Sequence, residues 1–337
     1  MISNVFDDPA FGVIPLSKTV SRMPYVPGRV GRLAFGPETQ DFVATTVVMA
    51  ELEAGVLSLV PSSPRGGNGV KADDDKRTVV PIRIPHFQHD VSINADEVQG
   101  VREFGTEDRM QTVEGVLNKK LMRAARRLDL TVESLRLGAV SGVVTDSNGV
   151  VLFDPFTSFG VSRPADVSFG LSNATTEIRT LCHQVRRTME DNIDLPVDTL
   201  EIRALCGNDF FDKFVSHQSV KSVYDNYVAA EQRNAGNYAY REPGFEFGGI
   251  TWENYRGTAD AMVRVGTSEC RLFPVNAPGL FAEIYGPGDV LEAVNTTALA
   301  RYATQWMWPN RKGWSVEVQT NVVPYCTRPN VLIRGTA

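Results

Sequence analysis

The chain has 337 residues, of which 42% are hydrophobic and 22% are charged. This is enough chain to bury the core of one large or two modest domains, and it excludes a wholly disordered protein. The formal net charge of −6 argues against tight, extended binding to nucleic acid, for which a strongly basic balance is usual. We therefore expect any contact with DNA to be weak and non-specific.

Residues 1–40 are predicted to form an extended arm. This segment contains five prolines, at positions 9, 15, 24, 27 and 37, which is too many for a helix. Its apolar residues follow no period, so the arm must lie on the rest of the chain or on a neighbour. We expect no signal peptide, because the first residues lack a basic segment followed by an apolar run, and no membrane span, because no stretch approaches about 18 apolar residues.

Residues 41–60 and 79–84 are predicted strands on either side of a long polar loop. Branched apolar residues are frequent in both strands, whereas residues 61–69 are mostly proline, serine and glycine. A hairpin of this length has too little core within a monomer, so we expect it to project and to lie on a partner. Charged residues at and near its tip are candidate contacts: Arg65, Lys71, Asp73, Asp74, Asp75, Lys76 and Arg77.

The clearest helix is predicted over residues 106–137, with a candidate kink at residues 129–133. Apolar residues recur at gaps of 3 and 4 from Met110 to Leu135, which is the helical period. The opposite face is basic and supplies further candidate contacts: Lys119, Lys120, Arg123, Arg126 and Arg127. Three interpretations remain open: a solvated helix surface, a patch that meets phosphates, or a dock for acidic residues of a neighbour, such as Asp73 to Asp75.

Two tight hairpins are predicted further along the chain. Residues 143–153 form strands around Asn148-Gly149, the commonest sequence of a two-residue turn. Residues 245–255 have the pattern of a strand, a Gly-Gly turn and a second strand.

The remaining predicted elements are two helices and two strands. The helices cover residues 174–191 and 208–230. Strict alternation over residues 314–323 predicts a long, half-buried strand, and residues 331–333 predict a short final one.

No pattern of catalytic or metal-binding residues stands out. His86 and His89 lie in a predicted strand, where they would face opposite sides. The glycine-rich residues 66–69 lack the Gly-Lys-Ser/Thr of a phosphate loop, and no GxSxG motif is present. We expect no catalytic residue, cofactor or metal site. The four cysteines contain no CxxC pair and are expected to be free, buried thiols: Cys182, Cys206, Cys270 and Cys326.

Five segments, in order along nearly the whole chain, resemble the lambda-type family of phage major capsid protein E. They are residues 55–66 (GVLSLVPSSPRG), 95–105, 142–160, 245–257 and 318–329. The resemblance implies an α+β fold of the Hong Kong 97 type. Its expected parts are an N-terminal arm (1–45), an extended β-hairpin loop (46–95), a peripheral domain (96–172 and 305–337) that contains the spine helix 106–137, and an axial domain (173–304).

The resemblance also implies a structural protein and not an enzyme. Hexamers and pentamers of the chain would assemble in the host cytoplasm, first as a procapsid, into the icosahedral virion shell of a tailed phage. The implied partners are a separate scaffolding protein, a portal, optionally a decoration protein, and packaged double-stranded DNA. The alternatives are a nanocompartment shell of the same fold, a soluble α/β enzyme, and a phage tail or head-completion protein.

Overall fold

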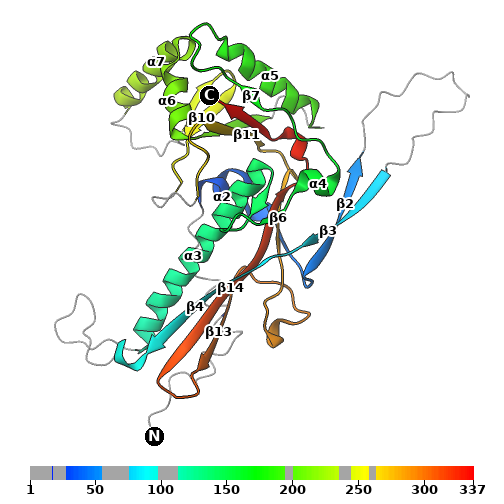
Figure 1. Cartoon of the computed structure of the whole chain (residues 1–337), viewed down its shortest axis with the longest axis vertical. Coiled ribbons are helices and arrows are strands. Elements are labelled where there is room, and N and C mark those ends of the chain that lie inside the picture. The colour runs from blue at the N-terminus through cyan, green and yellow to red at the C-terminus, as the bar shows by residue number, and fades with distance from the viewer. Residues whose placement is uncertain are drawn as a thin grey trace, which may run out of the picture.

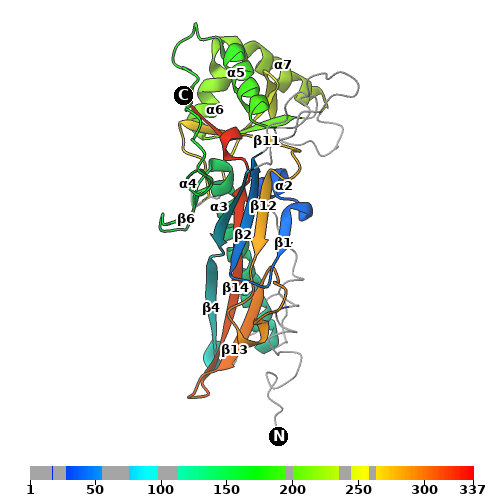
Figure 2. The same cartoon turned by 90° about the vertical axis from the view of Figure 1, so that its right-hand side faces the viewer.

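The elongated shape of the molecule comes from a five-stranded sheet that extends from a rounder helical lobe (Figure 1). A computed structural model describes residues 17, 28–54, 76–97, 113–193, 200–234, 244–257 and 263–337. The helical lobe contains a six-stranded sheet, and two clusters of buried apolar residues fill the molecule. Figure 2 shows that the five-stranded sheet is thin, so it needs a layer against one face to have a core.

Strand β14 organises the five-stranded sheet. Its first half pairs with β4 and β13, and its second half pairs with β12, beside which β1 lies in parallel. The bounds are Gln40–Phe42 (β1), His86–Asn94 (β4), Phe281–Tyr285 (β12), Tyr302–Met307 (β13) and Gly313–Cys326 (β14). The predicted alternation holds only in the first half of β14. From Val318 onward every residue of the strand is buried, because both faces of the sheet are covered there.

Helix α3 (Val113–Ser141) packs along one face of this sheet and joins both clusters. Its first half contributes residues three or four apart, which meet alternate residues of the strands. That smaller cluster consists of Ile93, Val116, Leu117, Leu121, Ala124, Ala125, Leu128, Ala303, Val316 and Val318. The second half, from Val132 to Val140, enters the larger cluster shared with the helical lobe.

The helix ends at Ser141 rather than at residue 137 as predicted. Gly138 does not stop it, because Ala139 and Val140 are buried and their packing outweighs the poor helix propensity of glycine. Gly142, at φ 84°, ends the helix, and the Val143 amide donates to the Gly138 carbonyl at 3.0 Å. The helix continues without a break through residues 129–133, and residues 106–112 lie outside the described residues.

The helical lobe is built around a sheet with the order β7-β15-β11-β8-β10-β9. Its strands are Val167–Ser168 (β7), Glu201–Cys206 (β8), Phe245–Phe247 (β9), Ile250–Asn254 (β10), Glu269–Val275 (β11) and Ile333–Thr336 (β15). Helices α5 (Ile178–Asp191), α6 (Asn208–Ser216) and α7 (Gln218–Asn234) flank it. The core is aromatic: the Trp252 and Phe214 rings stack 4.2 Å apart, and Phe169 meets Trp252 edge-on at 5.4 Å.

Both tight hairpins are confirmed. Strands β5 (Val144–Thr145) and β6 (Val151–Phe153) pair around the Asn148-Gly149 turn, where the Asp146 amide donates to the Val150 carbonyl at 2.9 Å. Strands β9 and β10 pair around Gly248 and Gly249, whose φ values of 64° and 75° favour glycine.

The helix predicted over residues 208–230 is wrong in one respect, because it is interrupted at His217. The backbone of His217 is extended, with ψ 139°, and its side chain is held from two directions. Nε2 lies 2.9 Å from the Asn173 carbonyl oxygen, and Nδ1 accepts from the Ser219 amide at 3.3 Å, which caps α7. The helix predicted from residue 174 begins only at Ile178.

The last predicted strand is also shifted. Residues Pro329–Val331 form a 3-10 turn, and the strand follows at Ile333–Thr336. Smaller elements complete the fold: α2 (Arg29–Ala34), α4 (Pro155–Phe159) and the 3-10 turns Pro37–Thr39, Ala95–Glu97 and Leu291–Ala293.

The two strands at the base of the predicted long hairpin are confirmed. Strand β2 (Val47–Ala54) pairs antiparallel with β3 (Lys76–Arg83), and Figure 1 shows the pair leaving the body to one side. The loop between the two strands lies outside the described residues.

A buried ion pair ties α3 to the five-stranded sheet. Arg136 is 1% exposed and Glu283 of β12 is fully buried. Arg136 Nε donates to Glu283 Oε1 at 2.8 Å, and Nη2 donates to Oε2 at 2.6 Å. Such a pair tolerates the loss of one partner poorly, because the other charge then stays in a dry interior.

We predict that Glu283→Gln destabilises the fold by about 3–5 kcal/mol, because Arg136 loses its buried carboxylate. The double variant Arg136→Met/Glu283→Leu removes both charges and is expected to recover most of this loss. Chemical denaturation of the purified protein measures both. Parent-like stability of Glu283→Gln would contradict the assignment of this pair as the anchor of α3.

Candidate assembly surfaces

The candidate contact residues fall into two groups. Arg65, Lys71, Asp73, Asp74 and Asp75 lie outside the described residues. Lys76 and Arg77 begin β3, where their backbones lie opposite Ala54 and Glu53 of β2. The five basic residues of α3 are all described.

The basic residues of α3 separate by what they contact. Lys119, Arg123 and Arg126 are exposed and, at spacings of four and three, share one face, which we call the basic helix face. Lys120 instead donates to the Ser92 carbonyl and to Glu97, and Arg127 Nη1 lies 2.9 Å from His89 Nε2. Lys120 and Arg127 thus bind the helix to its own sheet, at β4 and the turn after it.

Along β4 and β14, the face of the sheet that points away from α3 is polar. Val91 and Ile93 of β4 pack toward α3, so the alternate residues His86, Gln88 and Asp90 point away. They lie opposite Asn321, Gln319 and Glu317 of β14, respectively. Side-chain hydrogen bonds connect this face: His86 Nδ1 to Asn321 Oδ1 at 2.7 Å, and Gln88 Nε2 to Asp90 Oδ1 at 2.8 Å. His86 and His89 therefore face opposite sides, as predicted.

Three carboxylates, Asp90, Asp289 and Glu317, form what we call the acidic sheet face. Asp289 lies beside it, because its amide donates to Gln319 Oε1 at 2.9 Å. The pKa of Glu317 is raised, first by burial and then by the charges of Asp90 and Asp289, while His86 acts in the opposite direction.

The base of the β2–β3 hairpin is apolar on both of its faces. One face packs into the larger core through Ile82, with Val48 and Ala50 beside it, and Val80 on the same face is also buried. The other face exposes Val47 (42%), Met49 (62%) and Val79 (53%). We call these three residues the outer hairpin face; they form an exposed apolar patch with no cover from the described chain.

This outer hairpin face was not singled out from the sequence, although a signal for it exists. Residues 47–50 and 79–82 are unbroken apolar runs, and such runs are typical of strands buried on both faces. The alternation expected of a strand with one solvated face is absent.

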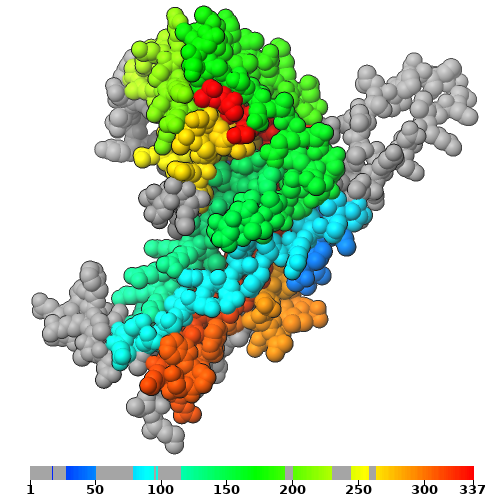
Figure 3. All heavy atoms as spheres, viewed as in Figure 1, coloured from blue at the N-terminus to red at the C-terminus, as the bar shows by residue number. Residues whose placement is uncertain are grey.

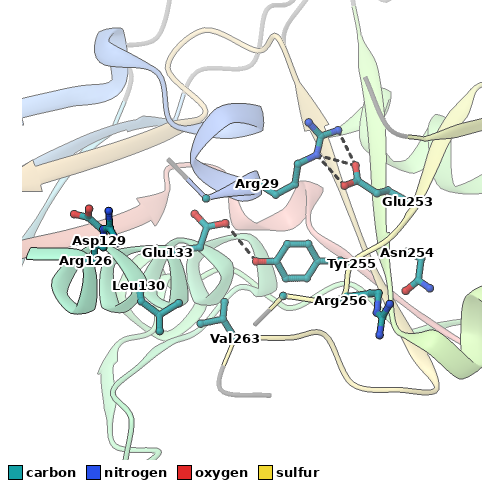
Figure 4. A pocket seen from close by; sticks show the side chains of 12 residues that line it. Arg29, Arg126, Asp129, Leu130, Glu133, Glu253, Asn254, Tyr255, Arg256 and Val263 are labelled. Atoms are coloured by element: carbon teal, nitrogen blue, oxygen red, sulfur yellow. Dashed lines mark hydrogen bonds and ion pairs between the residues drawn. The ribbon is translucent and has the colours of Figure 1, made fainter. Parts of the chain in front are cut away.

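A hollow of about 690 Å³ lies where α2, α3 and the segment after β10 meet (Figure 4). Glu133 of α3 accepts from the Val30 and Gly31 amides at 2.7 and 3.1 Å, at the start of α2. Across the hollow, Arg29 donates three hydrogen bonds of 2.7–2.9 Å to the carboxylate of Glu253. Burial, followed by the Glu133 charge, raises the pKa of Tyr255. The carboxylates of Glu133 and Glu253 are thus both hydrogen-bonded to the start of α2. We therefore interpret the hollow as a place where elements of the fold are held together.

Metal ligands, membrane-spanning helices and cysteines were each considered as further functional features. Within the described ranges, no group of three histidine, cysteine or acidic side chains is placed to hold a metal ion. None of the helices among the described residues is both long and apolar enough to cross a membrane. The four cysteines are free and buried, as predicted, and burial raises the pKa of the Cys182 thiol to about 12.

Comparisons with known proteins agree with this geometry. The family model described as phage major capsid protein E matches residues 13–337. The major capsid protein of Salmonella phage Felix O1 is 26% identical, with 96% of this chain and 95% of the relative aligned. That of Pseudomonas phage KPP10 is 27% identical over 83% and 84% of the two chains. A structure assigned as a capsid protein of an Escherichia coli CFT073 prophage aligns with a TM-score of 0.55, at 14% identity and 92% and 93% coverage.

The acidic sheet face generates a prediction about pH. Because the pKa of Glu317 is raised on folding, the folded protein holds this proton more tightly than the unfolded chain. Stability from this group therefore grows as pH falls through the raised pKa, and ionised Glu317 costs stability at neutral pH. We expect Glu317→Gln to raise the melting temperature at neutral pH and to have little effect near about pH 3, below the ordinary pKa of a glutamate.

The matched control is Glu292→Gln, an exposed glutamate in the loop before β13. It should change the melting temperature little at either pH. If Glu317→Gln lowers the melting temperature at neutral pH, the carboxylate repulsion is not the dominant interaction of this residue.

Proposed function

As a member of the phage major capsid protein E family, this chain is a structural protein of a phage head shell, and we propose that its copies self-assemble as hexamers and pentamers into an icosahedral shell around double-stranded DNA. Its fold is of the Hong Kong 97 type found in phage capsids. The proposed shell belongs to a tailed phage and passes through a procapsid stage.

The outer hairpin face is the observation that carries this proposal. Val47, Met49 and Val79 lie on a ribbon that leaves the body, where no described segment covers them. Burying a valine or methionine side chain fully is worth about 1.5–3 kcal/mol, so a neighbour that covers this face gains substantial free energy. A projecting two-stranded ribbon is also only marginally stable alone, which gives a second reason for it to lie on another subunit.

Each part of the chain has a proposed place in this assembly. We assign residues 1–45 to an N-terminal arm, 46–95 to the extended loop, 96–172 and 305–337 to a peripheral domain, and 173–304 to an axial domain. The helical lobe and the five-stranded sheet support a division into two bodies, since each has its own sheet, although β12 of the axial range joins the five-stranded sheet and β7 and β15 of the peripheral range join the sheet of the lobe. Strand β4, at the end of the proposed loop range, pairs with β14 and so connects the hairpin to the peripheral sheet.

Charged contacts are proposed to guide the assembly. The tip residues Arg65, Lys71 and Asp73 to Arg77 would meet oppositely charged groups of neighbours, since charge complementarity sets register and orientation more than affinity. The further proposed partners are a scaffolding protein, a portal, packaged DNA and, optionally, a decoration protein. Assembly is proposed to occur in the host cytoplasm, and no catalytic step is part of this function.

Negative-stain microscopy of the protein, expressed alone and with the neighbouring head genes, tests the proposal. We expect closed shells with hexameric and pentameric clusters. A DNA genome inside the shells separates a phage head from a nanocompartment, which would hold protein cargo instead. Small discrete oligomers under every condition, without shells, sheets or tubes, would overturn the proposal.

We predict that Met49→Asp/Val79→Asp prevents shell formation while leaving the subunit folded, because both side chains are exposed in the subunit and buried only in the assembly. Losing two apolar contacts of about 1.5–3 kcal/mol each raises the protein concentration needed for assembly by about 100-fold or more. Light scattering against protein concentration measures this shift.

The matched control is Val223→Asp, another exposed apolar residue, on helix α7 of the helical lobe. It should assemble near the parent concentration. Circular dichroism of all three proteins separates a loss of assembly from a loss of folding, and parent-like assembly of the double variant would show that the outer hairpin face is not a contact.

A further inference from the structure

Helix α3 presents an exposed face that is uniformly basic. Lys119, Arg123 and Arg126 are all exposed, and from Gly115 to Leu130 the helix contains one carboxylate, Asp129. That carboxylate is buried and paired with Arg301, so it does not neutralise the face. The three cations span about 10 Å of helix, at roughly 1.5 Å per residue.

The other side of the same layer has the opposite charge. Strands β4, β13 and β14 contain no lysine or arginine, whereas Asp90 and Glu317 lie opposite each other on the face that points away from α3. Asp289 adds a third negative charge there, since its amide donates to Gln319, two residues along β14 from Glu317 on the same face. The space-filling view shows β4 and the flank of α3 side by side along the elongated part of the molecule (Figure 3). The unit formed by α3 and the sheet beneath it therefore has a basic surface on its helix side and an acidic surface on its sheet side.

We propose that the basic helix face lines the inside of the shell and meets the phosphates of the packaged duplex DNA, while the acidic sheet face points away from the genome. This inference rests on the proposed function, because it requires a closed shell that holds DNA. It fixes which side of the layer is the interior and which residues touch the genome.

The chemistry of the face fits duplex phosphates. Lysine and arginine bind phosphates without regard to sequence, and successive phosphates of one strand are about 3.4 Å apart along the axis. Three cations over about 10 Å match about three phosphate steps. The net charge of −6 keeps such contact weak over the whole chain, as suits DNA that must enter and later leave. The reverse orientation would hold three carboxylates against the genome and would be repulsive.

The same face is less suited to a protein partner. A helix or strand that docks on a helix needs apolar anchors, and the residues around the basic helix face offer Met122 as their one exposed large apolar side chain. DNA needs none. Binding of a scaffolding protein, or of Asp73 to Asp75 of a neighbouring copy, remains a distinguishable outcome of the test.

Cysteine labelling of purified heads tests the orientation. The native cysteines are free and buried, so an added exposed cysteine reports its own position. Asn118→Cys lies beside Lys119, and Ser92→Cys lies on the acidic side of β4; both residues are exposed. With a polyethylene glycol maleimide too large to cross the shell, Ser92→Cys should react in intact DNA-filled heads. Asn118→Cys should react only after the heads are opened and emptied.

Two labelling results would overturn the proposal. Reaction of Asn118→Cys in intact, filled heads would place α3 on the outside. Protection that persists in opened, emptied heads would place the helix face in a contact between subunits.

Charge neutralisation tests the partner. The variant Lys119→Gln/Arg123→Gln/Arg126→Gln removes the three cations, and Arg187→Gln/Lys213→Gln/Lys221→Gln removes three exposed cations from α5, α6 and α7 as a matched control. We expect both to form shells. Short duplex DNA should bind opened heads of the first variant with a salt dependence shallower by about 2–3 in log–log slope, and its filled heads should release DNA at a lower temperature than the control.

Equal DNA binding and release by the two variants would overturn the proposal. So would a failure of the first variant alone to form shells, since the face would then contact a subunit or a scaffolding protein. If the parent protein itself forms no shells, the proposed function fails, and that result is distinct from either outcome.

Discussion

The structure depends on how firmly α3 is held at its middle. Asp129, Glu133 and Arg136, at spacings of four and three, bind Arg301, the amides that begin α2, and Glu283 of β12. Each of these interactions is buried, so each is costly to break on one side only. A single helix is thereby fixed to two bodies at once, and the elongated sheet keeps a defined position against the helical lobe.

With α3 anchored in this way, the molecule can leave apolar surface uncovered elsewhere. The first half of α3 and its sheet form a thin two-layer unit with a small core, and the hairpin base uses only one face to contact the larger core. Apolar area is left exposed on the outer hairpin face. A neighbouring copy that covers this area would gain free energy from its burial, in line with the assembly proposed above.

Charged side chains, like apolar ones, are partly used within the subunit and partly left exposed. Lys120 and Arg127 are bound to the turn after β4 and to β4 itself, whereas Lys119, Arg123 and Arg126 stay exposed. Carboxylates collect on the opposite face of the sheet. The layer formed by α3 and its sheet is thus polarised across its thickness without a basic composition overall.

The sequence by itself determined the elements whose signals are local. The 3–4 periodicity defined most of α3, the Asn148-Gly149 and Gly248-Gly249 turns defined two hairpins, and the order of the segments indicated the capsid family. Tertiary structure alone decided where α3 ends, that His217 interrupts a helix, which helix cations stay exposed and which hairpin face lacks cover. Each of these depends on residues distant in sequence: His217 is held by Asn173, 44 positions away, and Arg127 by His89, 38 positions away. Periodicity describes only a residue's own neighbours along the chain, whereas burial and pairing depend on what the fold brings against it.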